Sequence, residues 1–348
     1  MTSRERVLRA IAFEPADVIP LWQTGFFEQF MKNWQAAFPN YRRTPDEQYG
    51  YDTEICIGNE GFFPTPARVL EVKGDYTTAL DIWGRTLRTK KGGYFEDVLR
   101  HPLEEKSDLD KLEFESPLLE SRWDGFGERM NRVKSSGKCG FAKIGGLYIR
   151  SHFIRDEAEL LMDMLDDEPF CNELFDRVAA HFTAMALETL RRGDLWETGL
   201  FVFDDMASTH SPMFSPACFE KYFLPRYKRL IDTVRAAGCR HFFLHSDGDI
   251  RPLFDMLLEA GFEGFHPLEP RSGMDLVALR EKYGDRMVLF GGVCNTQILP
   301  RGDREEIRRH VEPLAVLARE GGVVLGMSSL AEDSSPQAYD YYMSLLGR

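Results

Sequence analysis

Two stretches of sequence decide the fold of this 348-residue chain: GLFVFDD at residues 199–205 and HFFLHSDGDI at residues 241–250. Each is a short run of aromatic and aliphatic residues that ends in acidic residues, as expected for a buried strand that stops at a polar loop. The stretch 224–234 lies between them, and its apolar residues recur at helical spacing. Strand, helix and strand in this order predict two parallel strands joined by a crossover helix.

The same alternation covers most of the chain. Strand-like runs occur at 18–21, 54–57, 140–144, 199–203, 241–244, 264–267, 287–290 and 323–325. Eight such units predict an α/β protein with a (β/α)8 TIM barrel, as a single domain over residues 1–348. A doubly wound open sheet is the alternative, but no Gly-x-Gly-x-x-Gly follows the first run to support it.

One segment, residues 65–100, interrupts the alternation. Alternating runs at 68–72 and 77–89 precede Lys91-Gly92-Gly93, and a Gly-Gly turn of this kind is typical of a β-hairpin. We expect an antiparallel β-hairpin insertion on the barrel rim. It either covers the barrel edge or serves as a lid or homodimer surface.

Composition excludes several functional classes. The 43 basic and 56 acidic residues give a net charge of −13, which disfavours binding to nucleic acid. No stretch reaches the roughly 18–20 consecutive apolar residues that a membrane span needs, and the N-terminus lacks the apolar core of a signal peptide. The six cysteines are scattered without a CxxC pair, so we expect reduced thiols and a cytoplasmic protein.

The residues that follow the predicted strands are the main functional signal. In a TIM barrel these positions converge on one mouth, and here they are rich in Asp, Glu, His and Gly. Adjacent residues alternate in direction, so only one of Asp204 and Asp205 can point directly into the mouth. We assign Asp205 to the site, while Asp204 could equally well cap the next loop or helix. His245 is a candidate metal ligand or proton shuttle, and Asp247 could ligate the metal beside it, orient the imidazole or carry a proton. An Asp-Gly turn before a helix is the structural alternative.

Glu220 is the third candidate ligand. It follows a predicted helix start at Ser215-Pro216, which lies on the same face of a barrel. Asp205, Glu220 and His245 together would form an oxygen-rich site that zinc accepts with water in an open position. A first-turn acidic residue favoured by the helix dipole explains Glu220 equally well.

The remaining strand exits suggest a substrate pocket. Glu269 and Asn295 could hydrogen-bond a substrate, with Glu269 also a candidate proton donor, and Cys294 is either a reactive thiol or a buried one. Aromatic residues after the first two strands predict an apolar pocket wall suited to an aromatic ligand. The candidate substrate-binding residues at these two exits are Trp22, Gln23, Asn59 and Phe62.

The order of motifs resembles the uroporphyrinogen decarboxylase superfamily over most of the chain. The matching stretches are Glu5-Arg-Val-Leu-Arg-Ala-Ile, Asp204-Asp205, Ser215-Pro216, Phe243-Leu-His-Ser-Asp-Gly-Asp, Glu259-Ala-Gly, Pro267-Leu-Glu-Pro, Gly273-Met-Asp, Lys282-Tyr-Gly-Asp and Phe290-Gly-Gly-Val. The resemblance implies a (β/α)8 barrel. It also implies either a decarboxylase or a methyltransferase that works with a corrinoid carried on a separate protein.

Departures from the family patterns separate these branches. Decarboxylases carry an Asp after the second strand and arginines near the first, whereas this chain has Gly58-Asn59-Glu60 and Leu21-Trp-Gln-Thr-Gly25. The coenzyme M methyltransferases use His-x-Cys and a distant Cys, whereas this chain has His245-Ser246-Asp247 and Met327-Ser-Ser329. Methyltransferases that demethylate methyl ethers resemble it more, because their zinc site combines carboxylates with a histidine, as Asp205, Glu220 and His245 would. His241 lies nearer to Glu220 in sequence, but it falls at the start of its strand and so at the wrong end of the barrel.

The resemblance therefore implies a corrinoid-dependent methyltransferase. It would transfer a methyl group from a small methyl donor, a methoxylated aromatic compound, to a corrinoid protein, with zinc as Lewis acid. Two alternatives stay open. One is a metal-free lyase acting on a different carboxylated substrate, and the other is a non-catalytic binding protein that keeps the barrel.

Overall fold

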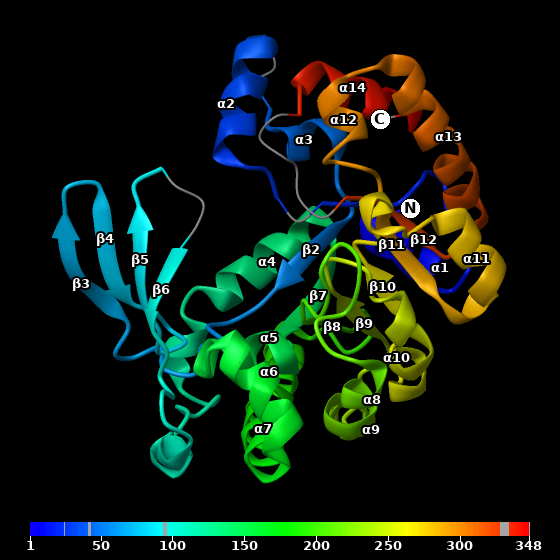
Figure 1. The fold of residues 1–348 in the computed structure, drawn as a ribbon. Helices are drawn as coiled ribbons and strands as arrows, with labels where there is room; N and C mark the ends of the chain where they lie inside the picture. The colour runs from blue at the N-terminus through cyan, green and yellow to red at the C-terminus, as the bar shows by residue number, and fades with distance from the viewer. Residues whose placement is uncertain (24, 41–42, 93–95, 328–333, 348) are drawn as a thin grey trace.

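The eight strand-like runs form one parallel sheet in the computed structural model, which describes residues 1–23, 25–40, 43–92, 96–327 and 334–347. Neighbouring strands follow the order β1-β12-β11-β10-β9-β8-β7-β2, curled into a nearly closed barrel (Figure 1). Their bounds are β1 Leu21–Trp22, β2 Thr53–Cys56, β7 Cys139–Gly145, β8 Leu200–Phe203, β9 Phe242–His245, β10 Gly264–His266, β11 Val288–Gly292 and β12 Val323–Gly326. The predicted TIM barrel is confirmed. The first strand is shorter and begins later than the run 18–21 suggests.

Asp52 joins β1 to β2, through both its backbone and its side chain. Among the described residues these two strands form no ladder with each other, but the Asp52 N–H donates to the Leu21 carbonyl at 3.0 Å and the Leu21 N–H donates to Asp52 Oδ2 at 2.8 Å. The second carboxylate oxygen of Asp52 pairs with the guanidinium of Arg6. Asp52 is fully buried. Its contacts with Leu21 and Arg6, which we call the clasp, take the place of strand pairing between β1 and β2.

Helices surround the barrel (Figure 1). They are α1 Ser3–Ile11, α2 Glu28–Ala37, α3 Pro45–Tyr49, α4 Phe126–Ser136, α5 Leu147–Ile154, α6 Glu157–Asp166, α7 Glu168–Gly193, α8 Pro216–Cys218, α9 Leu224–Ala236, α10 Phe254–Ala260, α11 Leu276–Tyr283, α12 Ile298–Arg301, α13 Arg304–Glu320 and α14 Pro336–Leu345. Short turns of helix are η1 Lys106–Lys111, η2 Glu120–Trp123, η3 Phe219–Phe223, η4 Arg251–Leu253, η5 Pro270–Ser272 and η6 Gly284–Arg286. Within the described ranges, no helix combines the length and apolarity needed to cross a lipid bilayer.

The interior of the barrel is filled by large rings. Alternate residues of a strand point to the same side, so Phe141, Phe201, Phe243 and Phe290 of four strands meet inside one buried cluster. Val7, Ala10 and Ile11 of α1 belong to the same cluster. The filled interior leaves chemistry to the residues at the carboxyl ends of the strands.

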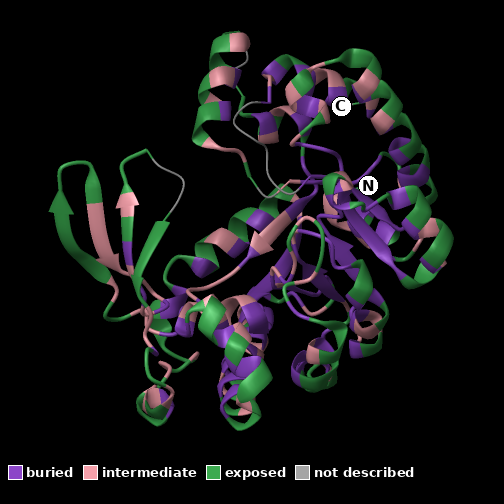
Figure 2. Cartoon of the chain, viewed as in Figure 1, coloured by how far each residue is buried: buried purple, intermediate pink, exposed green. Residues whose placement is uncertain are grey.

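The insertion is larger than the single hairpin we expected. It is a four-stranded antiparallel sheet of β3 Arg68–Lys73, β4 Tyr76–Leu80, β5 Thr86–Lys90 and β6 Glu96–Arg100. Most of it is exposed, including all of β3 and β6 (Figure 2). Gly93 of the predicted Gly-Gly turn lies outside the described residues. Its use as a cover, lid or homodimer surface stays a prediction.

Candidate metal centre

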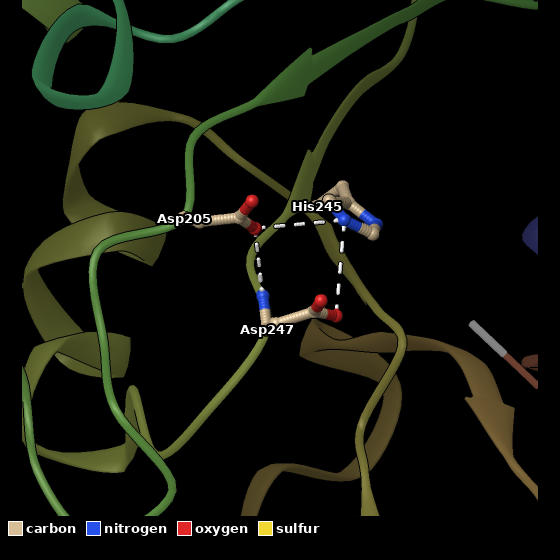
Figure 3. Close-up of side chains that lie close together, drawn as sticks. All are labelled: Asp205, His245 and Asp247. Carbon is tan, nitrogen blue, oxygen red and sulfur yellow. Dashed lines mark hydrogen bonds and ion pairs between the residues drawn. The ribbon is translucent and has the colours of Figure 1, made fainter. Parts of the chain in front are cut away.

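Three of the predicted side chains meet at the mouth of the barrel. His245 is the last residue of β9, Asp205 lies two residues after β8, and Asp247 lies two residues after β9. His245 Nε2 is 3.6 Å from Asp205 Oδ1 and 3.8 Å from Asp247 Oδ1 (Figure 3). Each residue offers a ligand atom within 4.8 Å of the other two, and they form the one such group of His, Cys, Asp and Glu side chains found in the described ranges.

The backbone around the centre is tightly fixed. The Asp247 N–H donates to Asp205 Oδ1 at 3.0 Å, which ties the two strand exits together. Ser246 Oγ, between His245 and Asp247 in the sequence, accepts the Met206 N–H at 3.0 Å. Gly248 then takes a positive φ of 85°, and a Cβ there would lie 2.4 Å from the Ser208 carbonyl oxygen. Only glycine fits this position, so the loop holds Asp247 in one place.

His245 is oriented by two rings. Phe203 stacks on its imidazole with ring centroids 4.3 Å apart, and His266 Nδ1 lies 2.6 Å from His245 Nδ1. Burial, and then the proximity of His245, hold the pKa of His266 well below its ordinary value, so His266 is neutral. A lone pair on His245 Nε2 requires the proton on Nδ1, and His266 Nδ1 is placed to accept that proton. The contact between the two imidazoles is therefore compatible with the tautomer of His245 that binds a metal.

Asp204 caps a helix, one of the two roles its sequence position allowed. Its carboxylate is fully buried and accepts the N–H groups of Tyr148 at 3.0 Å and Ile149 at 2.7 Å, in the first turn of α5. The Tyr227 hydroxyl donates to it as well. Burial raises the pKa of Asp204 to about 6, although these hydrogen bonds oppose the shift. The Asp204 carboxylate is therefore engaged by α5, and Asp205 is the member of the pair that joins the group at the barrel mouth.

The donor set fits a divalent cation such as zinc. Two carboxylates and one imidazole are ligands that zinc accepts, and ligand atoms around a tetrahedral zinc lie about 3.3 Å apart. The His245–Asp205 and His245–Asp247 separations of 3.6 and 3.8 Å are close to that value. The Asp205 and Asp247 side chains are 40% and 42% exposed, which leaves their outer side open to solvent and substrate.

Glu220 is not brought into this group. Ser215 does cap α8, as predicted, since its Oγ accepts the Cys218 N–H at 3.2 Å. The chain then enters the π-helical turn η3, where Glu220 is exposed to solvent. The third residue beside Asp205 and His245 is Asp247, for which the sequence suggested ligation as one of several roles.

The polar candidates Glu269 and Asn295 form hydrogen bonds that stabilise loops. Glu269 is buried and its carboxylate accepts the Gly248 N–H at 3.4 Å, with Arg271 at 3.4 Å on its other side, so it supports the loop that carries Asp247. Asn295 is buried and its carbonyl accepts the Ser334 hydroxyl at 3.5 Å. Cys294 is a buried free thiol.

Two of the predicted pocket residues lie in packed cores. Trp22 is 1% exposed and contacts Phe201 and His266 inside the barrel, with centroids 4.9 and 4.7 Å apart. Phe62 is fully buried outside the barrel, stacked on Phe114 at 4.2 Å. The structure therefore places Phe62 behind the mouth, where its ring supports the loop after β2.

The polar residues predicted beside them make local hydrogen bonds. Gln23 Nε2 donates to the Gly25 carbonyl at 2.6 Å, and Asn59 Oδ1 accepts the Gly61 N–H at 3.2 Å. Contacts of Gln23 and Asn59 with a substrate stay a prediction.

Sequence reasoning missed an ionic cluster beside the centre. Lys143 of β7 and Arg150 of α5 both pair with the carboxylate of Glu60, and Arg150 Nη2 lies 3.2 Å from it. The sequence does carry a sign of this cluster, because Lys143 is a charged residue in an otherwise apolar strand, two residues after the inward-facing Phe141. His266 was missed for a similar reason, because it ends a run read only as a strand.

The buried histidines predict that acid destabilises the fold. Burial lowers the pKa of His152 and of His181 to about 4, and it holds the pKa of His266 well below its ordinary value. Their unfolded pKa is about 6.5. The unfolded chain therefore binds more protons below pH 6.5, and stability falls as the pH drops from 6.5 towards 4. Asp204 acts in the opposite direction, because its folded pKa is raised.

We expect the free energy of unfolding to fall by about 3 kcal/mol or more between pH 7 and pH 5, since His152 and His181 each cost roughly 2 kcal/mol, Asp204 returns roughly 1, and His266 acts in the same direction as the other histidines. Urea unfolding at the two pH values measures this difference, and His181→Gln should reduce it. A stability that is unchanged or higher at pH 5 contradicts the prediction.

The family model for uroporphyrinogen decarboxylase (URO-D) matches residues 74–328. No curated protein sequence matches the chain. A solved structure titled a methyltransferase from Methanosarcina mazei superposes with a TM-score of 0.72 at 16% sequence identity, covering 100% of this chain and 98% of that one. At this identity the likeness shows a shared fold.

Proposed function

The chain belongs to the uroporphyrinogen decarboxylase family, and from that premise we propose that it is a methyltransferase that delivers the methyl group of a small methoxylated aromatic compound to a corrinoid on a partner protein. The group of Asp205, His245 and Asp247 carries the proposal. It offers metal ligands at the open end of the barrel, where enzymes of this fold place their chemistry. The loop after β2 has Gly58-Asn59-Glu60 in the region where decarboxylases of the family carry an Asp, and the Glu60 carboxylate pairs with two cations.

We propose that the three residues bind zinc. When bound there, zinc supplies a Lewis acid for the ether oxygen, which stabilises the oxygen as it keeps the electron pair of the broken C–O bond. The protein's own part is to hold the ligands and the substrate. His266 contacts His245, the loop at Gly248 fixes Asp247, and Glu269 supports that loop.

Phe203 provides an apolar ring next to the ligands, against which an aromatic substrate can lie. The pocket would therefore orient a methoxy group towards Asp205, His245 and Asp247. This orientation requires no residue to become a covalent nucleophile, which agrees with a centre that contains no cysteine.

The proposal is tested by following the corrinoid directly. Purified protein is mixed with cob(I)alamin and a panel of methoxyaromatics and methylamines under anaerobic conditions, and methylcobalamin is followed by its visible spectrum. We expect methylcobalamin to form only when protein and a methoxyaromatic are both present. If no member of the panel is demethylated, the methyltransferase assignment is wrong. Release of CO2 from a carboxylated member would favour the lyase alternative.

A further inference from the structure

A single lysine stands inside the barrel. The eight barrel strands, all of which lie within the described residues, contain one lysine, Lys143 of β7. It follows the inward-facing Phe141 by two residues, so its side chain also points into the barrel. That side chain is only 11% exposed. A buried lysine near the end of a barrel strand, where enzymes of this fold place their chemistry, is a candidate for proton transfer.

The Lys143 ammonium is held in place from one side. The carboxylate of Glu60 pairs with it, and the loop that carries Glu60 is fixed by Arg122, which donates to the carbonyls of Asn59 and Gly61 at 2.8 and 2.6 Å. Glu60 is the one hydrogen-bond acceptor that the described part of the chain gives Lys143 Nζ. An ammonium has three N–H groups, so Lys143 is anchored and still has protons to offer.

The charged groups that face Lys143 come from three elements. They are Glu60 of the loop after β2, Arg150 of α5 and Asp205 after β8. Burial lowers the pKa of Lys143, and so does Arg150, whereas Glu60 and Asp205 oppose the shift. Lys143 is therefore a stronger acid than an ordinary lysine. Because the ordinary pKa of a phenol is about 10, such an ammonium readily protonates a phenoxide.

The ammonium adjoins the metal centre. Lys143 Nζ lies 5.3 Å from the centroid of the Phe203 ring, and the same ring stacks on the imidazole of His245 with centroids 4.3 Å apart. Asp205, whose charge acts on Lys143, has its Oδ1 3.6 Å from His245 Nε2. The ring that would support an aromatic substrate thus lies next to both the ammonium and the metal ligands.

The residues that the sequence suggested as proton carriers have other roles. Asp247 belongs to the group of metal ligands. Glu269 accepts the Gly248 N–H at 3.4 Å and lies 3.4 Å from Arg271, so it supports the loop. A proton donor for the substrate oxygen must carry a proton and must not be a metal ligand. Lys143 meets both conditions.

We propose that Lys143 is the general acid of the methyl transfer and gives a proton to the oxygen that loses its methyl group. The inference rests on the proposed function. The bond between the methyl carbon and the oxygen breaks, and both of its electrons stay on the oxygen. The methyl carbon bonds to a cob(I)amide, which supplies the electron pair of the new bond. The oxygen takes one proton from Lys143 Nζ, and the neutral amine regains a proton from water.

The first test varies the leaving group. Methylcobalamin formation is compared for the methoxyaromatic that the wild type demethylates fastest and for its ring-fluorinated analogue, whose phenoxide is a weaker base and leaves without a proton. Lys143→Met should slow the first reaction by roughly 100-fold or more, as loss of a general acid does, and the second by less than about threefold. A structural ion pair predicts equal losses on both donors.

Lys143→Arg separates charge from proton transfer. Arginine keeps the positive charge and can pair with Glu60, but its guanidinium does not give up a proton. This variant should fold, keep its zinc and show the same selective loss as Lys143→Met, whereas a structural role predicts rescue. Lys138→Gln is the matched control, because Lys138 precedes the same strand at the opposite end of the barrel and pairs with Asp46 at 2.8 Å. It should change neither rate.

A second measurement needs no methyl transfer. 4-Nitrophenol, a phenol like the expected product, is bound to the protein without corrinoid, and its visible spectrum distinguishes phenol from phenolate. An ammonium that faces the oxygen favours the phenolate. Lys143→Met should therefore raise the apparent pKa of bound 4-nitrophenol by about one unit or more, and Lys143→Arg should leave it close to the wild-type value.

Equal losses on the two donors in Lys143→Met, rescue of the rate by Lys143→Arg, or an unchanged pKa of bound 4-nitrophenol would each overturn the inference. Failure of the proposed function has a different signature. If the wild type demethylates no methoxyaromatic, both the methyltransferase assignment and the role of Lys143 are wrong. If the wild type is active and Lys143→Met is equally active, only the role of Lys143 is wrong.

Discussion

Replacing His245 with glutamine is expected to remove bound zinc and to lower methyl transfer by roughly a thousandfold. Loss of a Lewis acid that supplies several kcal/mol of transition-state stabilisation corresponds to about that factor in rate. His245 is the only nitrogen ligand of the group, and it is the side chain that Phe203 and His266 hold in position. Its loss leaves Asp205 and Asp247 as two adjacent carboxylates.

The experiment compares metal content with activity. Wild type, His245→Gln and Asp205→Asn are purified without added metal, and zinc is determined by mass spectrometry alongside methylcobalamin formation. About one equivalent in the wild type and little in the two variants is the expected result. Circular dichroism melts establish that the variants fold. Full zinc content and activity in His245→Gln would contradict the metal centre.

Glu220→Gln is the control that separates two ligand sets. The sequence pattern assigns Glu220 to the metal, whereas the structure groups Asp247 with the other two ligands and leaves Glu220 exposed. We therefore expect Glu220→Gln to keep its zinc and Asp247→Asn to lose it. The opposite result would restore the sequence prediction and would require η3 to move when metal binds.

The fold could be predicted from the sequence because the same pattern, a short apolar run followed by a helical stretch, recurs along the chain. Most barrel strands are buried on both faces and therefore appear in the sequence as short apolar runs, and the polar residues that follow mark where each strand ends. The insertion was harder to predict. Leu70 and Leu99 stand at irregularities of its strand register, and these interrupt the alternation on which a strand prediction depends.

The site could be predicted only in part, because spacing along a chain does not give distance in space. Asp205 and His245 were found since both follow strands that are neighbours in the sheet. The loop after Asp205 closes through a bridge between Ala207 and Pro212 before the next helix begins, and this path leaves Glu220 in solvent. Lys143 and His266 sit inside runs that were assigned to strands alone.

Asp52→Ala is expected to reduce the free energy of unfolding by about 3–5 kcal/mol, as removal of one partner from a buried ion pair does. The variant would leave the buried Leu21 N–H without its acceptor and Arg6 with only the more exposed carboxylate of Asp17. It would also remove the clasp between β1 and β2, which no strand pairing replaces among the described residues. Urea unfolding at pH 7 measures the loss.

Asp17→Asn is the matched control, because Asp17 binds the same arginine from the surface. Arg6 Nε lies 2.8 Å from its carboxylate, but the Asp17 side chain is 38% exposed, so its loss should cost less than about 1 kcal/mol. Equal losses in the two variants would mean that the clasp contributes nothing beyond a surface ion pair.

The clasp and the metal centre should also be separable. The strands that carry Asp205 and His245 lie in the middle of the sheet order, away from the seam between β1 and β2. Asp52→Asn, which keeps the size of the side chain, should therefore be less stable yet still bind zinc when folded. Loss of zinc at a temperature where circular dichroism shows the native fold would mean that closure of the barrel sets the ligand geometry as well.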